Sequence, residues 1–245
     1  MKKTLVIIPT YNEIENIEPL IHQVFQIKIN LDILVVDDNS PDGTGDKVYN
    51  LINKYSKKLF LLRRKQKEGL GAAYVHGFLW AIKYNYDFIF EMDADFSHNP
   101  SELFPMLKLL NSNVDVVVGS RYIKGFNVVN WPLTRIIISY LASLYVRLIT
   151  LMPVKDPTAG FVGYKRDVLI SINLEQIKFV GYAFQIEMKY KSWLNGFVIQ
   201  EYPIIFLNRK YGESKMDKSI IWEALKGVLY LRLNKKYFQR KDENS

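Results

Sequence analysis

The sequence predicts an α/β fold in which a mostly parallel β-sheet is covered by helices on both faces. Three observations predict it. Short apolar runs recur along the first half of the chain, segments with helical spacing of apolar residues separate them, and several runs end in acidic residues. Buried parallel strands read as continuous apolar runs, and their alternation with helices is typical of doubly wound sheets.

The expected elements follow one another regularly through residue 122. Strands are expected at 4–11, 31–38, 59–62, 87–93 and 115–122, where mainly apolar runs are too short for helices. The intervening helices are expected at 17–25, 45–55 and 71–84, with a shorter helix before the fifth strand. The first helix is supported by apolar residues that share one helix face: Ile17, Leu20, Ile21, Val24 and Phe25.

The second half of the chain is less regular. A helix is expected at 130–154, a strand at 198–207 and an amphipathic helix at 218–236, followed by a charged tail at 237–245. We expect residues 1–230 to form a single domain, because a chain of 245 residues is long enough for one large core.

The composition excludes several classes of site. There is no cysteine, which excludes disulfides, thiolate metal sites and cysteine nucleophiles. Only three histidines occur, so few candidates exist for the base of a serine–histidine–acid triad. The net charge of +8 fits either solubility or an anionic partner: nucleic acid, an anionic membrane surface or a phosphorylated ligand.

Nucleic acid is the least supported of these partners. The sequence has no zinc-ligand spacing, no aromatic RNA-binding pattern and no helix carrying base-reading Arg or Asn. Its basic residues are scattered and interleave with acids. We therefore expect no nucleic-acid partner.

The amino-terminal stretch MKKTLVIIPTYNE is expected to be a strand and not a signal peptide. Its apolar run, residues 5–9, is shorter than the roughly 7–15 residues of a signal sequence, and no small-residue cleavage site follows. A cytosolic start of the chain is therefore expected.

Polar residues gather where the expected strands end. They are Pro9, Tyr11 and Glu13 after the first strand, Asp37 and Asp38 after the second, Asp93 and Asp95 after the fourth, and Arg121 after the fifth. One such carboxylate is more often a helix cap or a turn former, as Asp42 is expected to be before Gly43. Acids at three strand ends, with an arginine at another, are harder to explain as caps. Ligands of parallel sheets bind beyond these ends.

Asp93-Ala94-Asp95 is the most informative of these groups. Two carboxylates one residue apart repel each other, and a divalent ion between them removes the repulsion. Mg²⁺ and Mn²⁺ prefer such oxygen ligands and often share their coordination shell with substrate phosphates. The alternative is that Asp95 or Ser97 caps a helix that begins near Ser101.

Six short motifs stand out in chain order. They are PTYNE at 9–13, VVDDNSPDGT at 35–44, GLGAAYVHG at 69–77, MDADFSHNP at 92–100, GSRY at 119–122 and RKYGESK at 209–215. Their set and order resemble inverting family-2 glycosyltransferases and, within these, the dolichyl- and polyprenyl-phosphate mannose synthases. The resemblance covers about residues 4 to 230.

The resemblance implies the GT-A fold of nucleotide-diphosphosugar transferases and a set of donor-binding residues. The positions that match nucleoside contacts are Pro9, Tyr11, Glu13, Val36 and Asp38. The metal and diphosphate motif is Asp93, Ala94 and Asp95, and relatives vary between glutamine and serine where Ser97 stands. Arg121, Arg209 and Lys215 match residues that contact the donor diphosphate or the sugar. Asp95, Arg121, Arg209 and Lys215 are the expected catalytic set.

The implied activity is metal-dependent transfer of mannose from GDP-mannose to dolichyl or polyprenyl phosphate, with inversion, which gives a β-mannosyl phospholipid. A lipid phosphate is already ionised at pH 7, so the reaction needs no strong general base. Two alternatives are a related enzyme that transfers glucose from UDP-glucose to the same lipid, and a nucleotide-sugar-binding protein without turnover.

The acceptor side is expected around residues 130–161. Arg135 and Ser139 fit the pattern R-x-x-x-S, which the resemblance assigns to the acceptor phosphate, and they lie one turn apart on one helix face. Asp156, in DPTAGF, matches a motif that shapes the acceptor side, or serves as a turn residue before Pro157. Residues 209–215 are read as a lid over the donor or as a solvated loop.

Membrane association is expected to be peripheral, on the cytoplasmic face. The longest uncharged stretch of 130–154 is Ile136 to Val146, 11 residues. That falls short of the roughly 20 residues that span a bilayer. Helices 130–154 and 218–236 are therefore expected to lie at the membrane interface, with core packing as the alternative for each.

Overall fold

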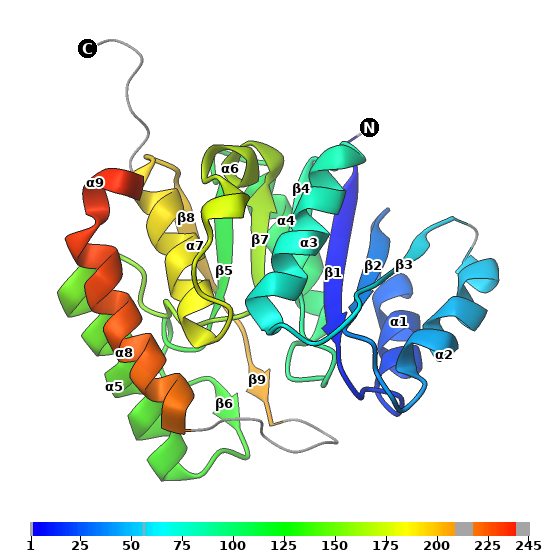
Figure 1. Ribbon diagram of the computed structural model, residues 1–245, viewed down its shortest axis with the longest axis horizontal. Coiled ribbons are helices and arrows are strands. Elements are labelled where there is room, and N and C mark those ends of the chain that lie inside the picture. The colour runs from blue at the N-terminus through cyan, green and yellow to red at the C-terminus, as the bar shows by residue number, and fades with distance from the viewer. Residues whose placement is uncertain (1, 56, 209–217, 239–245) are drawn as a thin grey trace.

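The protein is built on one seven-stranded sheet, which Figure 1 shows in the computed structural model. The structure describes residues 2–55, 57–208 and 218–238. The sheet has the order β3-β2-β1-β4-β7-β5-β8, and β6 and β9 form a separate pair. The strands are β1 (Thr4–Thr10), β2 (Asp32–Asp37), β3 (Leu59–Arg63), β4 (Phe88–Glu91), β5 (Val116–Ser120), β6 (Val128–Val129), β7 (Val162–Lys165), β8 (Ile199–Pro203) and β9 (Phe206–Leu207).

Helices cover both faces of the sheet, as the sequence predicts. The α-helices are α1 (Ile17–Phe25), α2 (Thr44–Leu51), α3 (Leu70–Lys83), α4 (Leu103–Leu110), α5 (Leu133–Thr150), α6 (Arg166–Ser171), α7 (Tyr182–Leu194), α8 (Lys218–Leu233) and α9 (Lys235–Phe238). Short 3₁₀ helices occur at η1 (Ile52–Tyr55), η2 (Pro100–Glu102) and η3 (Leu174–Gln176).

Strand β1 shows why both faces must be covered. Val6 and Ile8 pack in one core cluster with residues of α1 and α4, whereas Leu5 and Ile7 pack in a second cluster with residues of α3. Side chains alternate between the two faces of a strand, so a strand that is apolar throughout needs helices on each side. The continuous apolar run predicted this arrangement correctly.

Strand β7 departs from the expected order. It pairs antiparallel with β4 and with β5. The other neighbouring strands of the seven-stranded sheet pair in parallel. Neither β7 nor α7 is expected from the sequence. The strand expected at 198–207 is also divided: β8 joins the main sheet, and β9 pairs with β6 below the carboxyl edge.

A third cluster lies beside the sheet and joins three helices. Val146 of α5, Ile186 of α7 and Val228 of α8 pack in it. Helix α5 lies on the outside of this group at the left of Figure 1. By length and composition alone, α5 is apolar enough to cross a membrane, and only 17% of its 18 residues are buried.

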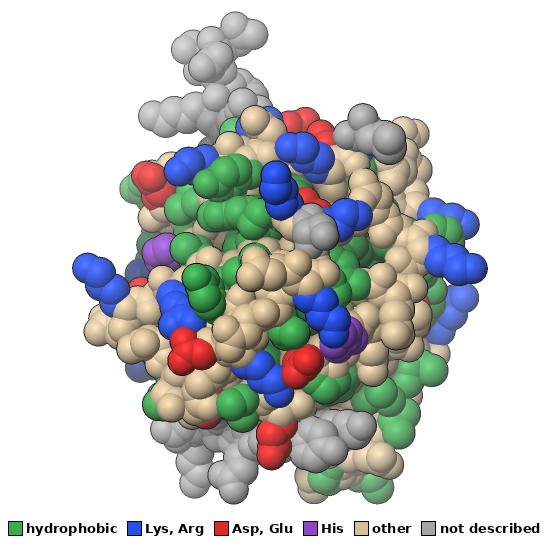
Figure 2. Space-filling view, turned by 90° about the vertical axis from the view of Figure 1, so that its right-hand side faces the viewer, with side chains coloured by type: hydrophobic (Ala, Val, Ile, Leu, Met, Phe, Trp, Pro, Cys, Tyr) green, Lys and Arg blue, Asp and Glu red, His purple; other side chains and the backbone are tan. Residues whose placement is uncertain are grey.

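The surface at the opposite end of the sheet is mixed in character. Figure 2 shows this side, at the β3 edge, where Lys and Arg side chains are interspersed with acidic and apolar ones. The pattern agrees with the scattered basic residues of the sequence.

Candidate active site

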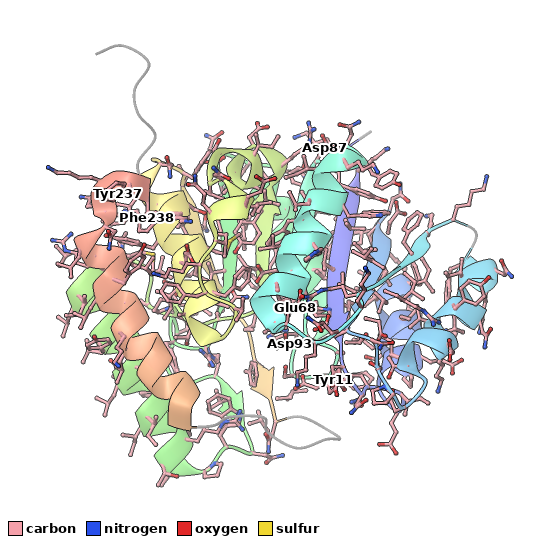
Figure 3. All side chains as sticks on the ribbon, in the orientation of Figure 1. Tyr11, Glu68, Asp87, Asp93, Tyr237 and Phe238 are labelled. Atoms are coloured by element: carbon pink, nitrogen blue, oxygen red, sulfur yellow. The ribbon has the colours of Figure 1, made fainter. Side chains whose placement is uncertain are left out.

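Residues from separate parts of the sequence meet at the carboxyl edge of the sheet. Figure 3 shows Tyr11, which follows β1, and Asp93, which follows β4, at this edge together with Glu68. Asp87, which precedes β4, lies at the opposite edge. The expected gathering of strand-end residues is therefore confirmed for the first and fourth strands.

Two hydrogen bonds hold Asp93 in the loop that follows β4, one to its backbone and one to its carboxylate. The backbone N–H of Asp93 donates to Nδ1 of His98 at 3.1 Å. The hydroxyl of Tyr74, on α3, lies 3.4 Å from Oδ1 of Asp93 and donates to it. Burial, and then the charges of Asp93 and Glu91, raise the pKa of Tyr74 well above 10.0, so this hydroxyl keeps its proton.

Asp95 bonds within the same loop and does not cap the following helix. Its Oδ1 accepts the backbone N–H of Ser97 at 3.1 Å. The N-cap of η2 is Asn99, whose Oδ1 accepts the N–H of Ser101 at 3.0 Å. The alternative in which Asp95 or Ser97 caps this helix is therefore wrong, because Asn99 occupies that position.

The loop offers oxygen donors that fit a divalent ion. The Asp93 side chain is 32% exposed, so its carboxylate can reach a ligand in solution. Ser97 is 1% exposed, and its hydroxyl has no hydrogen-bond partner among the described residues. A buried hydroxyl without a partner is costly unless something absent from the chain satisfies it. Two carboxylates and this hydroxyl are hard oxygen ligands of the kind Mg²⁺ and Mn²⁺ take.

The described residues contain no cluster of three or more His, Cys, Asp or Glu side chains that could hold a metal. An ion at Asp93 and Asp95 would therefore need further oxygens from Ser97, a substrate or water. Mg²⁺ commonly binds in this way, with one or two carboxylates and substrate phosphates. The residues present fit a metal that is shared with an anionic ligand.

The loop backbone is held in an unusual conformation. Phe96 has φ of 63°, a left-handed value that is rare for an aromatic residue. The carbonyl of Ser97 accepts the N–H of Leu207 in β9 at 3.2 Å. Strained residues persist only where neighbouring contacts fix them. The hydrogen bonds at both ends of the loop are contacts of this kind.

Asp38, one of the expected nucleoside contacts, forms a buried ion pair with Arg64 just after the ends of β2 and β3. Asp38 is 5% exposed and accepts from Nη1 of Arg64 at 2.9 Å. Burial raises the pKa of the Asp38 carboxyl above its ordinary value, although the Arg64 charge acts to lower it. Arg64 also donates to Glu68. Sequence reasoning missed both of these partners.

The other expected nucleoside residues differ in exposure. Val36 is fully buried in the sheet and contributes no side-chain surface to a ligand. Pro9, Tyr11 and Glu13 are partly exposed, and the amine of Lys67 lies 4.3 Å from the centre of the Tyr11 ring. Asp37, which the sequence places beside Asp38, is buried and accepts from Thr10 and Ser40. Its role is to close the turn after β2.

Arg121 is held by Asp156, 35 residues further along the chain. Nε of Arg121 donates to Oδ2 of Asp156 at 2.8 Å, and Nη2 donates to Oδ1 at 2.6 Å. Asp156 is fully buried and also accepts the backbone N–H of Arg121 at 2.9 Å. Burial acts to raise the pKa of this carboxyl, but the charge and hydrogen bonds of Arg121 outweigh it and hold the pKa below 3.8. Asp156 therefore orients Arg121 and is more than a turn residue.

Arg135 and Ser139 of α5 each bond to a different part of the site. Ser139 Oγ accepts from the hydroxyl of Tyr122 at 2.7 Å. Arg135 donates to Oδ1 of Asn208 at 3.2 Å, and its guanidinium lies 3.9 Å from the Trp131 ring centre. Because Tyr122 directly follows Arg121, the Tyr122–Ser139 bond ties the end of β5 to α5.

A buried polar network lies behind the loop. Nζ of Lys189 donates to the carbonyl of Ala159 at 2.7 Å and to Oε1 of Gln185 at 3.0 Å. Gln185 in turn donates to Glu91, the last residue of β4. Burial lowers the pKa of Lys189 to about 8 and raises that of Glu91 to about 8. The network joins α7, the end of β4 and the segment that carries Asp156.

Several functional contacts fall outside what the sequence predicted. No spacing in the chain pairs Asp156 with Arg121 or Lys189 with Ala159, and the partner of His98 is a backbone N–H. Arg209 and Lys215, two of the expected donor contacts, lie outside the described residues, as does the whole segment 209–215, for which the sequence predicts a lid or a solvated loop.

Comparison with protein families gives one match over most of the chain. The model of "Glycosyl transferase family 2" matches residues 5–172. A polyprenol monophosphomannose synthase of Mycolicibacterium smegmatis is 42% identical over 224 residues, which cover 91% of this chain and 84% of that protein. An undecaprenyl-phosphate mannosyltransferase of Micrococcus luteus is 42% identical over 226 residues, which cover 92% of this chain and 92% of that protein.

Solved structures share the fold at low sequence identity. Glucosyl-3-phosphoglycerate synthase of Mycobacterium tuberculosis superposes with a TM-score of 0.68 at 16% identity, over 94% of this chain and 79% of that one. A mannosyltransferase of Pyrobaculum calidifontis, solved in complex with GDP-Man and Mn²⁺, gives a TM-score of 0.56 at 16% identity. The superposition covers 96% of this chain and 71% of that one. The expected GT-A-like fold is thereby confirmed.

Proposed function

The chain belongs to glycosyltransferase family 2, and from this membership we propose that it transfers mannose from GDP-mannose to the phosphate of a polyprenyl or dolichyl phosphate. The reaction proceeds with inversion and yields a β-mannosyl phospholipid. Two relatives at 42% identity carry names that describe mannosyl transfer to polyprenyl lipids. They support the sugar and the class of acceptor.

One structural observation carries the proposal: the candidate donor site and an exposed apolar helix are joined by a hydrogen bond. Tyr122, at the end of β5, donates to Ser139 of α5. Arg121, the preceding residue, belongs to the carboxyl edge where Asp93 and Asp95 lie. A lipid phosphate bound at α5 would therefore be presented to a sugar held at the strand ends.

On the donor side, Asp93, Asp95 and Ser97 would hold Mg²⁺ or Mn²⁺, while Pro9, Tyr11, Glu13 and Asp38 would border the nucleoside and the buried Val36 would support them from within the sheet. A divalent ion bound there supplies Lewis-acid stabilisation of the charge on the leaving diphosphate. The Pyrobaculum mannosyltransferase of the same fold was solved with GDP-Man and Mn²⁺, which supports this choice of donor and ion.

The chain's own residues supply orientation and positive charge. Arg121, held by two hydrogen bonds to Asp156, places a fixed cation at the strand ends where negative charge grows. Arg209 and Lys215 are proposed to add charge to the diphosphate. An ionised lipid-phosphate oxygen forms the new bond to the anomeric carbon as the bond to the diphosphate breaks, and GDP leaves. This single displacement inverts the configuration.

On the acceptor side, Arg135 and Ser139 are proposed to bind the lipid phosphate. Helix α5 exposes apolar side chains along its length, and Arg135 and Arg147 bracket its uncharged stretch. Its exposed apolar residues are Leu133, Ile137, Ile138, Tyr140, Leu141, Leu144 and Leu148, and the exposed Leu151 directly follows the helix. An apolar face with basic residues at its ends suits a helix that lies in a membrane interface.

We propose that the protein is peripheral and sits on the cytoplasmic face of a membrane. One side of α5 packs in the third cluster with α7 and α8, which favours an interfacial position over a spanning one. Residues 1–230 are proposed to act as a single catalytic domain. The segments 130–154 and 218–236 are proposed to form its interface helices, and 237–245 its charged tail.

The direct test is to incubate the purified full chain with polyprenyl phosphate, Mn²⁺ or Mg²⁺, and radiolabelled GDP-mannose or UDP-glucose. The proposal predicts labelled, alkali-stable mannolipid from GDP-mannose and none without the metal. Glucolipid from UDP-glucose alone would establish the related glucosyltransferase. Absence of product with both donors would identify a nucleotide-sugar-binding protein.

A further inference from the structure

We propose that His98 is a positioning residue that fixes Asp93, and through it the metal-binding carboxylates, by accepting the backbone N–H of Asp93. The inference rests on the proposed function, because it assigns Asp93 to the metal and donor diphosphate. It adds a residue to the site that is neither an acid nor a contact to the substrate.

The hydrogen bond itself is the first observation. Nδ1 of His98 accepts the N–H of Asp93 at 3.1 Å. An imidazole nitrogen accepts only when it carries no proton, so the neutral ring must carry its proton on Nε2. Nε2 lies 3.9 Å from Oδ2 of Asp93, too far for a hydrogen bond but on the side of the carboxylate. Both ring nitrogens therefore lie within 3.9 Å of atoms of one aspartate.

The second observation is that the ring is held rigidly. His98 is 1% exposed. Its ring stacks on Phe161 with centroids 4.8 Å apart and planes 15° apart, and meets Phe206 edge to face at 5.5 Å. These rings come from the segment after Asp156 and from β9. The acceptor nitrogen is thus placed by parts of the chain distant in sequence from the loop.

The third observation is the shape of the loop that the bond closes. Asp93 begins it and His98 ends it, with Phe96 in the left-handed conformation between them. A short loop with such a residue needs contacts at both ends to keep one conformation. Removal of the acceptor frees the first residue of the metal motif while the aromatic packing remains.

Packing alone is the competing explanation of His98, and two substitutions separate the two roles. His98→Phe keeps a ring between Phe161 and Phe206 but removes the acceptor. His98→Asn keeps an acceptor oxygen near the position of Nδ1 but removes the ring. Phe161→Leu is the matched control, because it removes the stacked ring and leaves the acceptor in place.

The test measures Mn²⁺ binding by electron paramagnetic resonance with the full-length protein in saturating GDP, alongside urea unfolding of each variant. We expect the Mn²⁺ affinity of His98→Phe to fall about 10-fold or more, the range seen when partners of metal ligands are removed. We expect His98→Asn and Phe161→Leu to bind Mn²⁺ within about 3-fold of wild type, although both lose packing and unfold at lower urea. Excess Mn²⁺ should restore turnover of His98→Phe.

The inference is overturned if Mn²⁺ affinity follows stability across the three variants, or if His98→Phe binds Mn²⁺ as wild type does. Should His98→Phe fail to fold, loss of Mn²⁺ binding by a folded His98→Asn overturns it, and retention supports it. Wild type that binds no Mn²⁺ with GDP contradicts the proposed function and the inference together. If wild type binds Mn²⁺ with GDP and His98→Phe binds it equally well, the inference alone is contradicted.

Discussion

The loop from Asp93 to His98 and helix α5 border the same site but are built in opposite ways. The loop is tied down by hydrogen bonds from α3, from β9 and from its own side chains. Helix α5 instead leaves half of its residues exposed and has three buried residues, Ser143, Val146 and Thr150. The difference suits the proposed roles, a fixed geometry for a small charged donor and an open apolar surface for a long lipid.

The strongest test of the contrast is Asp93→Asn together with Asp95→Asn. Loss of a carboxylate should lower turnover roughly 100- to 1000-fold, as loss of transition-state charge stabilisation does. The free energy of unfolding should change little, because the Asp93 side chain is 32% exposed. Glycolipid formation and urea unfolding measure the two effects. Asp46→Asn, whose side chain is 75% exposed on α2, is the control. Turnover close to wild type in the double variant would remove the loop from catalysis.

The second test concerns the buried pair that orients Arg121. Asp156→Asn leaves the guanidinium without its charged partner and should lower the free energy of unfolding by about 3–5 kcal/mol. Asp46→Asn, which breaks an exposed pair with Arg63, should cost less than about 1 kcal/mol. Equal losses for the two variants would show that Asp156 serves only as a turn residue.

The same pair predicts a pH dependence of stability. Burial acts to raise the pKa of Asp156 in the folded protein. The charge and hydrogen bonds of Arg121 outweigh burial and hold this pKa below its ordinary value of 3.8. A folded pKa below the unfolded one gives stabilisation that is complete above the unfolded value and is lost as pH falls through the folded value. The difference in the free energy of unfolding between wild type and Asp156→Asn should therefore shrink below about pH 4. If the free energies of unfolding of wild type and Asp156→Asn differ by the same amount from pH 7 to pH 3, the assigned ion pair is contradicted.

Helix α5 gives the next largest effect, and it should appear in lipid binding and not in stability. Ile137→Ser with Leu141→Ser removes two side chains that are 55% and 54% exposed. Burying such a side chain in lipid contributes about 1.5–3 kcal/mol, so binding to anionic vesicles should weaken at least about 10-fold. Ile170→Ser, 51% exposed on α6 at the other edge of the sheet, is the matched control. Equal vesicle binding by all three proteins would refute the interface role of α5.

The smallest expected effect is on acceptor recognition. Arg135→Ala should raise the KM for polyprenyl phosphate about 10-fold, since a charge-assisted bond contributes roughly 1.5–3 kcal/mol. The KM for GDP-mannose should stay within about 2-fold, because Arg135 lies on α5 and not on the donor loop. A larger change in the donor KM would place Arg135 on the donor side and weaken the separation of the two regions.

The sequence predicted those parts of the molecule that depend on local pattern. The apolar runs of β1 and β2 and the helical spacing of α1 appear where expected, because both signals lie within one element. Strand β7 was missed because Val162–Lys165 is short and follows a turn without an alternating pattern. Helix α7 was missed because Glu187, Lys189 and Lys191 are buried there, so polar residues interrupt its apolar face.

The candidate site divides in the same way. Asp93 and Asp95 are recognisable because they stand one residue apart at the end of an apolar strand. The partner of His98 is a backbone N–H, which no residue type reveals, and Asp156 meets Arg121 across 35 residues. The contact between Arg121 and Asp156 depends on the pairing of β5 with antiparallel β7, which the sequence did not predict.

The most direct measurement is a crystal structure of the protein with GDP-mannose and Mn²⁺. If Asp93 and Asp95 hold the ion, it should lie roughly 2.1 Å from a carboxylate oxygen of either residue and from an oxygen of the donor diphosphate. The ion bound elsewhere, or both carboxylates turned away from the diphosphate, would contradict it.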